Sequence, residues 1–209
     1  MTTTTSVQVP LSPLLVARVL RSPGEVFAAF AERPPSAARV FFGFALWLLI
    51  LPPLFAYVGT AAFGWRLGVA PITLPRPVIA AVSAAYFLLL LFGLLSTAAI
   101  ARWMAKTYGA RESFGASLAL VAVVGVPLAL GSAAHLYPHA FLNVIVLVPA
   151  LIASMYLLYR GLPTVLGIDP GRGMLMASSL IAYLLVAWVS LLGLTVVLWS
   201  RGIGPRIGA

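Results

Sequence analysis

The stretch VIAAVSAAYFLLLLFGLLSTAAIA, Val78–Ala101, decides the fold because it contains no Asp, Glu, Lys, Arg or His. A helix rises about 1.5 Å per residue, so about 20 apolar residues cross the roughly 30 Å hydrocarbon layer of a membrane. This stretch therefore predicts a membrane-spanning helix. Four further stretches share its length and its lack of charge: Val40–Val58, Phe114–Ala134, Ala140–Tyr159 and Gly173–Ser200. The sequence thus predicts an all-α polytopic membrane protein with a bundle of five transmembrane helices.

The rest of the chain is short. Its 209 residues are 62% hydrophobic and 8% charged, which leaves no room for a soluble module beside one membrane domain. The expected organisation is a disordered tail over 1–11, amphipathic interfacial helices over 12–35, a five-span membrane domain over 36–201 and a short outer tail over 202–209. The spans are expected at about 38–60, 78–103, 114–136, 140–160 and 173–200.

The net charge of +9 raises the possibility of nucleic-acid binding, but the positions of the charges indicate membrane topology instead. Lys and Arg are retained on the cytoplasmic side of short loops. With five spans, one side collects Arg18, Arg21, Arg33, Arg39, Arg102, Lys106, Arg111, Arg160 and Arg172, together with the acidic residues Glu25, Glu32, Glu112 and Asp169. The other side collects Arg66, Arg76, Arg201 and Arg206. This asymmetry predicts a cytoplasmic N-terminus and an outer C-terminus. Twelve of the thirteen basic residues are Arg and Ala is abundant, which indicates a GC-rich, bacterial genome, so we expect a multi-pass protein of the bacterial inner membrane.

Two amphipathic segments precede the first span. Ser12-Pro13 opens one, and Ser22-Pro23-Gly24-Glu25 has the pattern of a capping box that opens the other. We expect them to lie in the membrane interface, with Phe rings toward lipid and Arg side chains at headgroups. A cytosolic cap packed under the bundle and a substrate gate are the alternatives. The candidates for contact with lipid or a partner are Arg18, Arg21, Phe27, Phe30, Arg33 and Arg39.

Polar and aromatic residues mark the ends of several spans. Ser113 is expected to cap the start of the third span, and Asp169-Pro170 the start of the fifth. The second span ends at Arg102-Trp103, which we expect to be a basic and aromatic anchor at the inner interface.

Prolines interrupt three spans. A proline within a helix lacks the amide that would bond to the carbonyl one turn earlier, so it kinks or ends the helix. The candidates for helix kinks are Pro52, Pro53, Pro127 and Pro149. Pro127 and Pro149 either shape the bundle or expose carbonyl oxygens along a path for a small solute.

Residues able to perform catalysis do not converge in this sequence. No span holds two carboxylates, and cysteine is absent. His135 and His139 have the spacing of a metal pair on one helix, but Pro138 disfavours helical geometry between them. We therefore expect no enzyme activity, no catalytic or metal site and no cofactor. The aromatic residues deep in the spans, Trp47, Tyr86, Tyr183 and Trp188, are expected to mark buried positions.

Three short motifs resemble one known family. They are Leu20-Arg21-Ser22-Pro23 with Phe27, Phe30 and Glu32-Arg33-Pro34; Tyr108–Phe114 leading toward Pro127; and Tyr156–Pro163 closing the fourth span. Together with the five-span layout they resemble bacterial members of the Yip family, named for proteins that interact with Ypt/Rab GTPases. The resemblance implies an all-helical integral membrane protein with a cytosolic N-terminus, and in eukaryotic members a role in vesicle traffic and GTPase binding. This chain has Arg-Ser-Pro-Gly where the eukaryotic relatives carry an acidic Asp-Leu-Tyr-Gly-Pro signature.

The expected function is that of a non-enzymatic membrane scaffold or organiser. Its cytoplasmic face would contact anionic lipid or partner membrane proteins, and association with a second copy of the chain is left open. A channel or facilitator for a small solute, using the proline-kinked helices, is one alternative. An accessory subunit of a larger membrane complex is another.

Overall fold

The structure is a computed structural model that describes residues 14–66, 71–110 and 113–201. The expected tails at 1–11 and 202–209, with Arg206, lie outside the described residues, as do Arg111 and Glu112. In chain order the elements are α1 Leu14–Arg21, α2 Pro23–Glu32, α3 Ala37–Val40, the π-helix η1 Phe41–Ala45, α4 Leu46–Phe63, α5 Arg76–Thr107, α6 Phe114–Val124, α7 Val126–Gly131, the 3₁₀-helix η2 Ser132–Leu136, α8 Ala140–Leu166 and α9 Pro170–Ser200.

Five helical segments are long and apolar enough to span a membrane, which confirms the predicted fold class. They cover Ala37–Phe63, Arg76–Thr107, Phe114–Leu136, Ala140–Leu166 and Pro170–Val197. Among the described residues β-structure is limited to two isolated bridges, Trp65 with Ile72 and Arg66 with His139. Both lie beside the α4–α5 connection.

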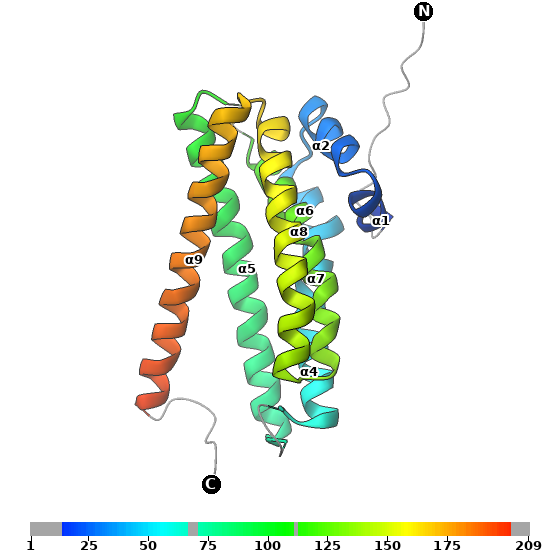
Figure 1. Ribbon diagram of the computed structural model, residues 1–209, viewed down its shortest axis with the longest axis vertical. Coiled ribbons are helices and arrows are strands. Elements are labelled where there is room, and N and C mark those ends of the chain that lie inside the picture. Colours follow the sequence, from blue (N-terminus) through cyan, green and yellow to red (C-terminus); the bar gives the residue numbers. More distant parts are fainter. Residues whose placement is uncertain (1–13, 67–70, 111–112, 202–209) are drawn as a thin grey trace, which may run out of the picture.

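The spans form an up-and-down bundle (Figure 1). The connection from α4 to α5 lies at one end, and α1, α2 and the α8–α9 connection lie at the other (Figure 1). The α6–α7 segment is the central span: α6 contacts α2, α3, α5 and α8, and α7 contacts α4 and α8. The last span, α9, contacts only α5 and α8 among the elements with substantial contacts, and its far end diverges from the bundle (Figure 1).

The fourth span is longer than its sequence pattern predicts. We expected it to end near residue 160, whereas α8 continues through Pro163 to Leu166. It ends where Gly167 adopts the left-handed conformation, with φ 67° and ψ 39°, and the amides of Gly167 and Ile168 both donate to the Pro163 carbonyl. Such a left-handed glycine is a common helix stop. The extra turns remain helical because Leu162, Val165 and Leu166 are buried against neighbouring helices.

The fifth span also begins earlier than expected, at Pro170 rather than 173. Asp169 precedes it and accepts hydrogen bonds through Oδ2 from the amides of Gly171 and Arg172, at 2.9 Å and 3.4 Å. Ser113 performs the same task for α6, where its Oγ accepts from the Ala116 amide at 3.3 Å. Both predicted N-terminal caps are therefore confirmed.

The prolines occupy different positions in their helices. Pro127 lies in the first turn of α7, and Gly125 separates α7 from α6. Pro52 and Pro53 lie inside the continuous helix α4, and Pro149 lies inside the continuous helix α8. Neither helix ends at its prolines, because each proline removes only its own amide and the following residues continue the ladder.

The first span contains a π-helical turn that the sequence pattern does not predict. Residues Phe41–Ala45 form one π-helical turn, at the end of which the Leu46 amide donates to the Phe41 carbonyl. Single π-turns inside α-helices are uncommon and widen the helix locally. This turn carries Phe44 and Ala45 into the core, and it lies near the end of the bundle that α1 and α2 cover.

Candidate functional site: the basic end of the bundle

Helices α1 and α2 form a cap packed on the bundle. Leu15 and Val19 of α1 are fully or almost fully buried, and so is Val26 of α2. α2 contacts both α6 and α8. The cap, which was one of the alternatives for this segment, is therefore the arrangement that the structure has.

The two phenylalanines of α2 do not face lipid, which corrects their assignment as lipid-contact candidates. Phe27 is 1% exposed and Phe30 is 3% exposed. The Phe27 ring packs on Gly161 of α8, where a methyl group in place of the glycine hydrogen would come within 2.6 Å of the ring and 2.8 Å of Leu120. Phe27 is buried against protein rather than exposed to lipid because Gly161 has no side chain and leaves space for the Phe27 ring.

The predicted capping box of α2 is also absent. The Ser22 side chain makes no capping hydrogen bond at the start of α2. The backbone amide of Ser22 is already occupied, since it donates to the Arg18 carbonyl at 2.8 Å. Glu25 therefore has no free amide to bind at Ser22, and its carboxylate is exposed. The backbone hydrogen bond from the Ser22 amide to the Arg18 carbonyl joins α1 to the start of α2 in place of a side-chain cap.

The arginines of this region are all exposed. Arg18, Arg21, Arg33 and Arg39 lie on the solvent-facing side of the cap or at the start of the first span. Their positions are held by the buried residues close to them on the same helices, such as Val19 beside Arg18. The structure thus places four exposed cations next to buried, packed residues.

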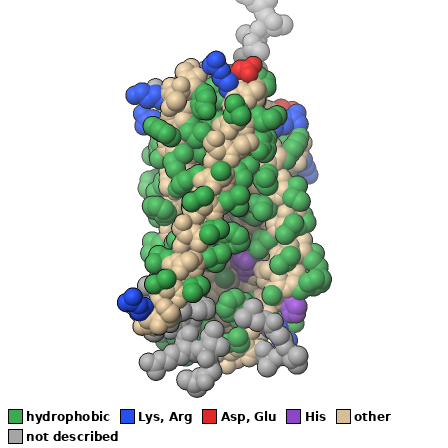
Figure 2. Space-filling view, turned by 60° about the vertical axis from the view of Figure 1, so that its left-hand side comes forward, with side chains coloured by type: hydrophobic (Ala, Val, Ile, Leu, Met, Phe, Trp, Pro, Cys, Tyr) green, Lys and Arg blue, Asp and Glu red, His purple; other side chains and the backbone are tan. Residues whose placement is uncertain are grey.

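Most of the described basic residues lie at this same end of the bundle. The group consists of Arg18, Arg21, Arg33, Arg39, Arg102, Lys106, Arg160 and Arg172. Arg66, Arg76 and Arg201 lie at the opposite end. Figure 2 shows charged side chains at the two ends and an apolar band between them. Glu25, Glu32 and Asp169 share the more basic end and offset part of its charge.

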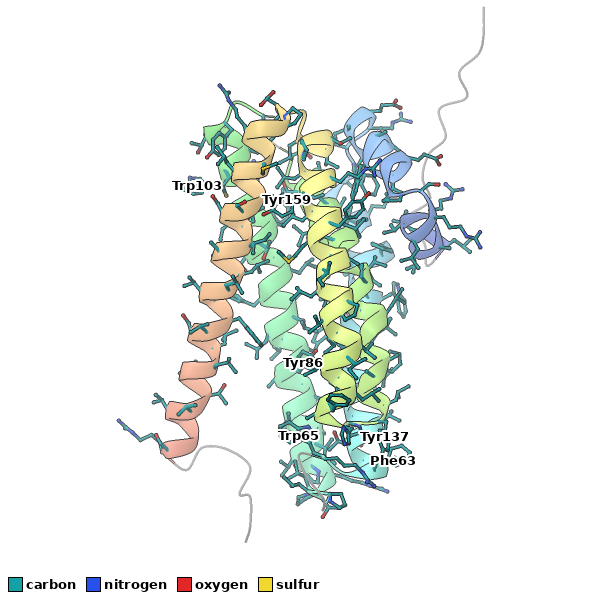
Figure 3. All side chains as sticks on the ribbon, in the orientation of Figure 1. Phe63, Trp65, Tyr86, Trp103, Tyr137 and Tyr159 are labelled. Carbon is teal, nitrogen blue, oxygen red and sulfur yellow. The ribbon has the colours of Figure 1, made fainter. Side chains whose placement is uncertain are left out.

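A shallow cavity of about 540 Å³, widely open to the outside, adjoins this end between α5 and the start of α6. The described residues that line it are Ala99, Arg102, Trp103, Lys106 and Phe114. Trp103 is 66% exposed and projects from the side of the bundle (Figure 3). The sequence marked Arg102-Trp103 as an interfacial anchor, but the cavity depends on where α6 begins beside α5, which no local pattern reveals.

The opposite end carries a small polar network. His135 Nδ1 lies 2.6 Å from Asn143 Oδ1, and His135 Nε2 lies 3.5 Å from the Tyr86 hydroxyl. The Asn143 side-chain amide donates to the His139 carbonyl at 3.0 Å. These contacts link α5, η2 and α8; Tyr86, which takes part in them, is labelled in Figure 3. The network therefore cross-links three segments of the bundle.

The two histidines serve different contacts. His139 stacks on the Tyr137 ring, with centroids 6.3 Å apart and planes inclined by 4°. His135 points instead to Asn143 and Tyr86. The part of the chain that the structure describes holds no cluster of three or more His, Cys, Asp or Glu that could bind a metal ion.

Two of the four deep aromatic residues are not buried. Trp47 is 60% exposed and Trp188 is 63% exposed, whereas Tyr86 and Tyr183 are half-buried. The expectation of burial is wrong for the tryptophans because their positions lie on outward faces of α4 and α9. In a membrane an outward face meets lipid, where a large aromatic ring is well accommodated.

Comparison with known proteins identifies relatives of this chain. The family model of the Yip1 domain matches residues 17–191. The chain is 32% identical over 158 residues to the inner membrane protein YohC of Escherichia coli strain K12, an alignment that covers 75% of this chain and 81% of the relative. The inner membrane protein YohC of Escherichia coli O6:H1 strain CFT073 is similar to the same extent. No solved structure matches the chain.

Proposed function

Because the chain belongs to the Yip1 family of integral membrane proteins, we propose that it is a non-enzymatic scaffold of the bacterial inner membrane. Its basic end contacts anionic lipids or partner membrane proteins. The observation that carries the proposal is the cluster of exposed cations on and around the α1–α2 cap.

The packing of the cap supports this role. Leu15, Val19, Phe27 and Phe30 anchor α1 and α2 to the bundle, so these helices do not depend on lipid for their position. The backbone positions of the exposed arginines are therefore set by this packing before any partner binds. Preorganisation lowers the entropy lost on binding and so favours contact with a partner surface.

The proposed orientation places this end in the cytoplasm, with the N-terminus inside and the C-terminus outside. Lys and Arg next to membrane spans are retained in the cytoplasm, and the described cations are concentrated at the capped end. A periplasm-active reporter fused after Ala209 should be active, and a cytoplasm-active reporter there should be silent. The reverse pattern would overturn the orientation.

The lipid contact is tested by removing equal charge from the two ends. We expect Arg18→Gln with Arg21→Gln to reduce the enrichment of phosphatidylglycerol in polymer nanodiscs excised around the protein. An anionic surface attracts each nearby cation by about 1 kcal/mol, so the electrostatic preference should fall roughly fivefold per charge at most. Arg76→Gln with Arg201→Gln is the matched control, because both side chains are exposed at the other end. Equal effects of the two pairs would contradict the proposal.

Partner contact is tested with the same pairs. Chemical cross-linking in intact cells, followed by mass spectrometry, should detect neighbours through the capped end. Arg18→Gln with Arg21→Gln should weaken those cross-links while the control pair retains them. Retention by both pairs, together with unchanged lipid enrichment, would remove the basis of the scaffold proposal.

A further inference from the structure

A continuous stripe of exposed side chains runs along α5 to its basic end. Its members follow one another at alternating spacings of four and three residues, which places them on one face of a helix. They are, in order, Leu88, Phe92, Leu95, Ala99, Arg102 and Lys106. All six are exposed, with neither α6 nor α9 covering them. The face is apolar over its first four members and cationic over its last two.

The length of α5 sets the depth of these two parts. Its 32 residues extend about 48 Å at about 1.5 Å per residue, while the hydrocarbon layer is roughly 30 Å thick. The last turns of α5 therefore reach beyond the hydrocarbon layer when the helix spans it. Arg102 and Lys106 consequently lie at the level of the lipid headgroups, and Leu88, Phe92 and Leu95 lie beside the acyl chains.

The cationic part of the stripe lines the cavity between α5 and α6. Arg102 and Lys106 occur there together with Trp103, an aromatic side chain that favours the membrane interface. The described lining also includes Ala99 and Phe114, so its inner side is apolar. No carboxylate occurs among these described lining residues.

Two like charges one helical turn apart repel each other. Such a pair at i and i+4 is unfavourable. An anion bound between the two groups attracts both of them, and these attractions outweigh the repulsion between the cations. A guanidinium binds a phosphate through two parallel hydrogen bonds, and an ammonium adds a mobile point charge. Arg102 with Lys106 thus matches a phosphodiester that carries one negative charge.

We propose that this face of α5 binds one anionic phospholipid. Its phosphodiester lies between Arg102 and Lys106, its headgroup lies beside Trp103, and one acyl chain follows Leu95, Phe92 and Leu88. The combination of a cationic cavity with an apolar stripe directly below it selects a lipid over a small soluble anion. This site rests on the proposed contact of the basic end with anionic lipid and specifies one lipid position there. It uses none of the α1–α2 arginines, and it does not depend on which side of the membrane the capped end faces.

The test is native mass spectrometry of the delipidated full-length protein in detergent, titrated separately with phosphatidylglycerol and with phosphatidylcholine of the same chains. We expect the first phosphatidylglycerol to bind more tightly than phosphatidylcholine. Arg102→Gln with Lys106→Gln should weaken that first binding event about 25-fold, at roughly fivefold per charge. Binding of phosphatidylcholine should weaken less, because its choline ammonium offsets the charge of its phosphodiester. Arg102→Lys with Lys106→Arg should retain most of the preference.

The control variant is Arg18→Gln with Arg21→Gln, which removes the same charge from the cap and should leave the first binding event intact. This control also separates the two proposals, because it affects the scaffold surface alone. Equal affinity of the protein for both lipids, or equal weakening by both charge-removing pairs, would overturn the site.

Two other occupants are distinguished in the same experiment. Displacement of the lipid by millimolar inorganic phosphate would assign the cations to a soluble anion and overturn the proposal. Dimers that appear in place of lipid adducts, and that dissociate in Arg102→Gln with Lys106→Gln, would assign the face to a second copy of the chain and overturn it too. Retention of the lipid adduct on monomers in phosphate supports the lipid site.

Discussion

The third and fifth spans have similar apolar composition and opposite positions in the bundle. In the most apolar part of Phe114–Leu136, 61% of the residues are buried, whereas in that of Pro170–Val197 only 6% are buried. The third span is surrounded by other helices, whereas the fifth contacts only α5 and α8 among the elements with substantial contacts and diverges from the bundle toward its far end (Figure 1). Apolar character therefore determines that a segment enters the membrane and leaves open what it touches there.

Close packing of small residues contributes to the difference. α6 begins with the small residues Gly115, Ala116 and Ser117, all buried, which allow neighbouring backbones to approach closely. In α9 the last buried residue is Leu180, and every described side chain beyond it is half-buried or exposed. Lipid tails solvate Leu and Val as well as a protein interior does, so helices associate where small residues permit close contact.

The largest loss of stability is expected from removal of the Phe27 ring, which packs the cap against the bundle. Phe27→Ala should reduce the free energy of unfolding by about 3–5 kcal/mol, because it leaves a cavity beside Gly161 and Leu120. Phe141→Ala is the control, since Phe141 is 68% exposed on α8. Thermal unfolding in detergent should separate the two. Similar midpoints would show that the cap does not stabilise the third span.

A backbone contact offers the next largest effect. A Cβ at Gly115 would lie 2.0 Å from the Pro35 carbonyl oxygen, so Gly115→Ala must displace the segment leading into α3. We expect a loss of about 2–3 kcal/mol. Gly193→Ala on α9 meets nothing within 4 Å and should be neutral or slightly stabilising. Equal thermal stability of the two alanine variants would refute the distinction between the spans.

A smaller change in stability is expected from the polar network at the far end of the third span. A double-mutant cycle of His135→Ala and Asn143→Ala should give a coupling of about 1 kcal/mol, since the two side chains meet at 2.6 Å. Thr195→Ala should cost less, because its hydroxyl bonds only to the Leu191 carbonyl within α9. Denaturant unfolding of the unchanged protein, the two single variants and the double variant measures the coupling. A value near zero would mean that the network does not join η2 to α8.

The smallest effect concerns a buried hydroxyl. Ser154 is 4% exposed and its Oγ has no hydrogen-bond partner among the described residues. Ser154→Ala should therefore be neutral or stabilising by up to about 1 kcal/mol, because no bond is lost and one polar group is no longer buried. Ser190→Ala, on the exposed part of α9, should change nothing measurable. A clear loss of stability in Ser154→Ala would reveal a partner for that hydroxyl.

Local rules predicted the features that depend on neighbours in the chain. The caps at Ser113 and Asp169 formed because a polar side chain next to free amides bonds to them wherever the helix packs. The capping box at Ser22 failed because α1 occupied the amide in advance, through the Arg18 carbonyl. The end of α8 was misplaced because packing sustains a helix through Pro163 that propensity alone would stop.

In the candidate site, too, some features could be predicted from the sequence and others could not. The exposure of Arg18, Arg21, Arg33 and Arg39 could be predicted, since isolated charges avoid burial. The burial of Phe27 could not, because it requires the recess at Gly161, which is distant in sequence. The cavity beside Arg102 likewise needs α5 and α6 side by side.

The sequence by itself determined that the chain crosses a membrane with five helices, because every long uncharged stretch is stable only where water is excluded. It also determined the sorting of basic residues between the two ends, because that follows from loop order alone. Only the tertiary structure decided which span is central, where α1 and α2 rest and which face of α5 stays uncovered. The reason is physical: hydrophobicity drives transfer from water into the membrane, but within the membrane it no longer distinguishes lipid from protein, so shape and close packing make that choice.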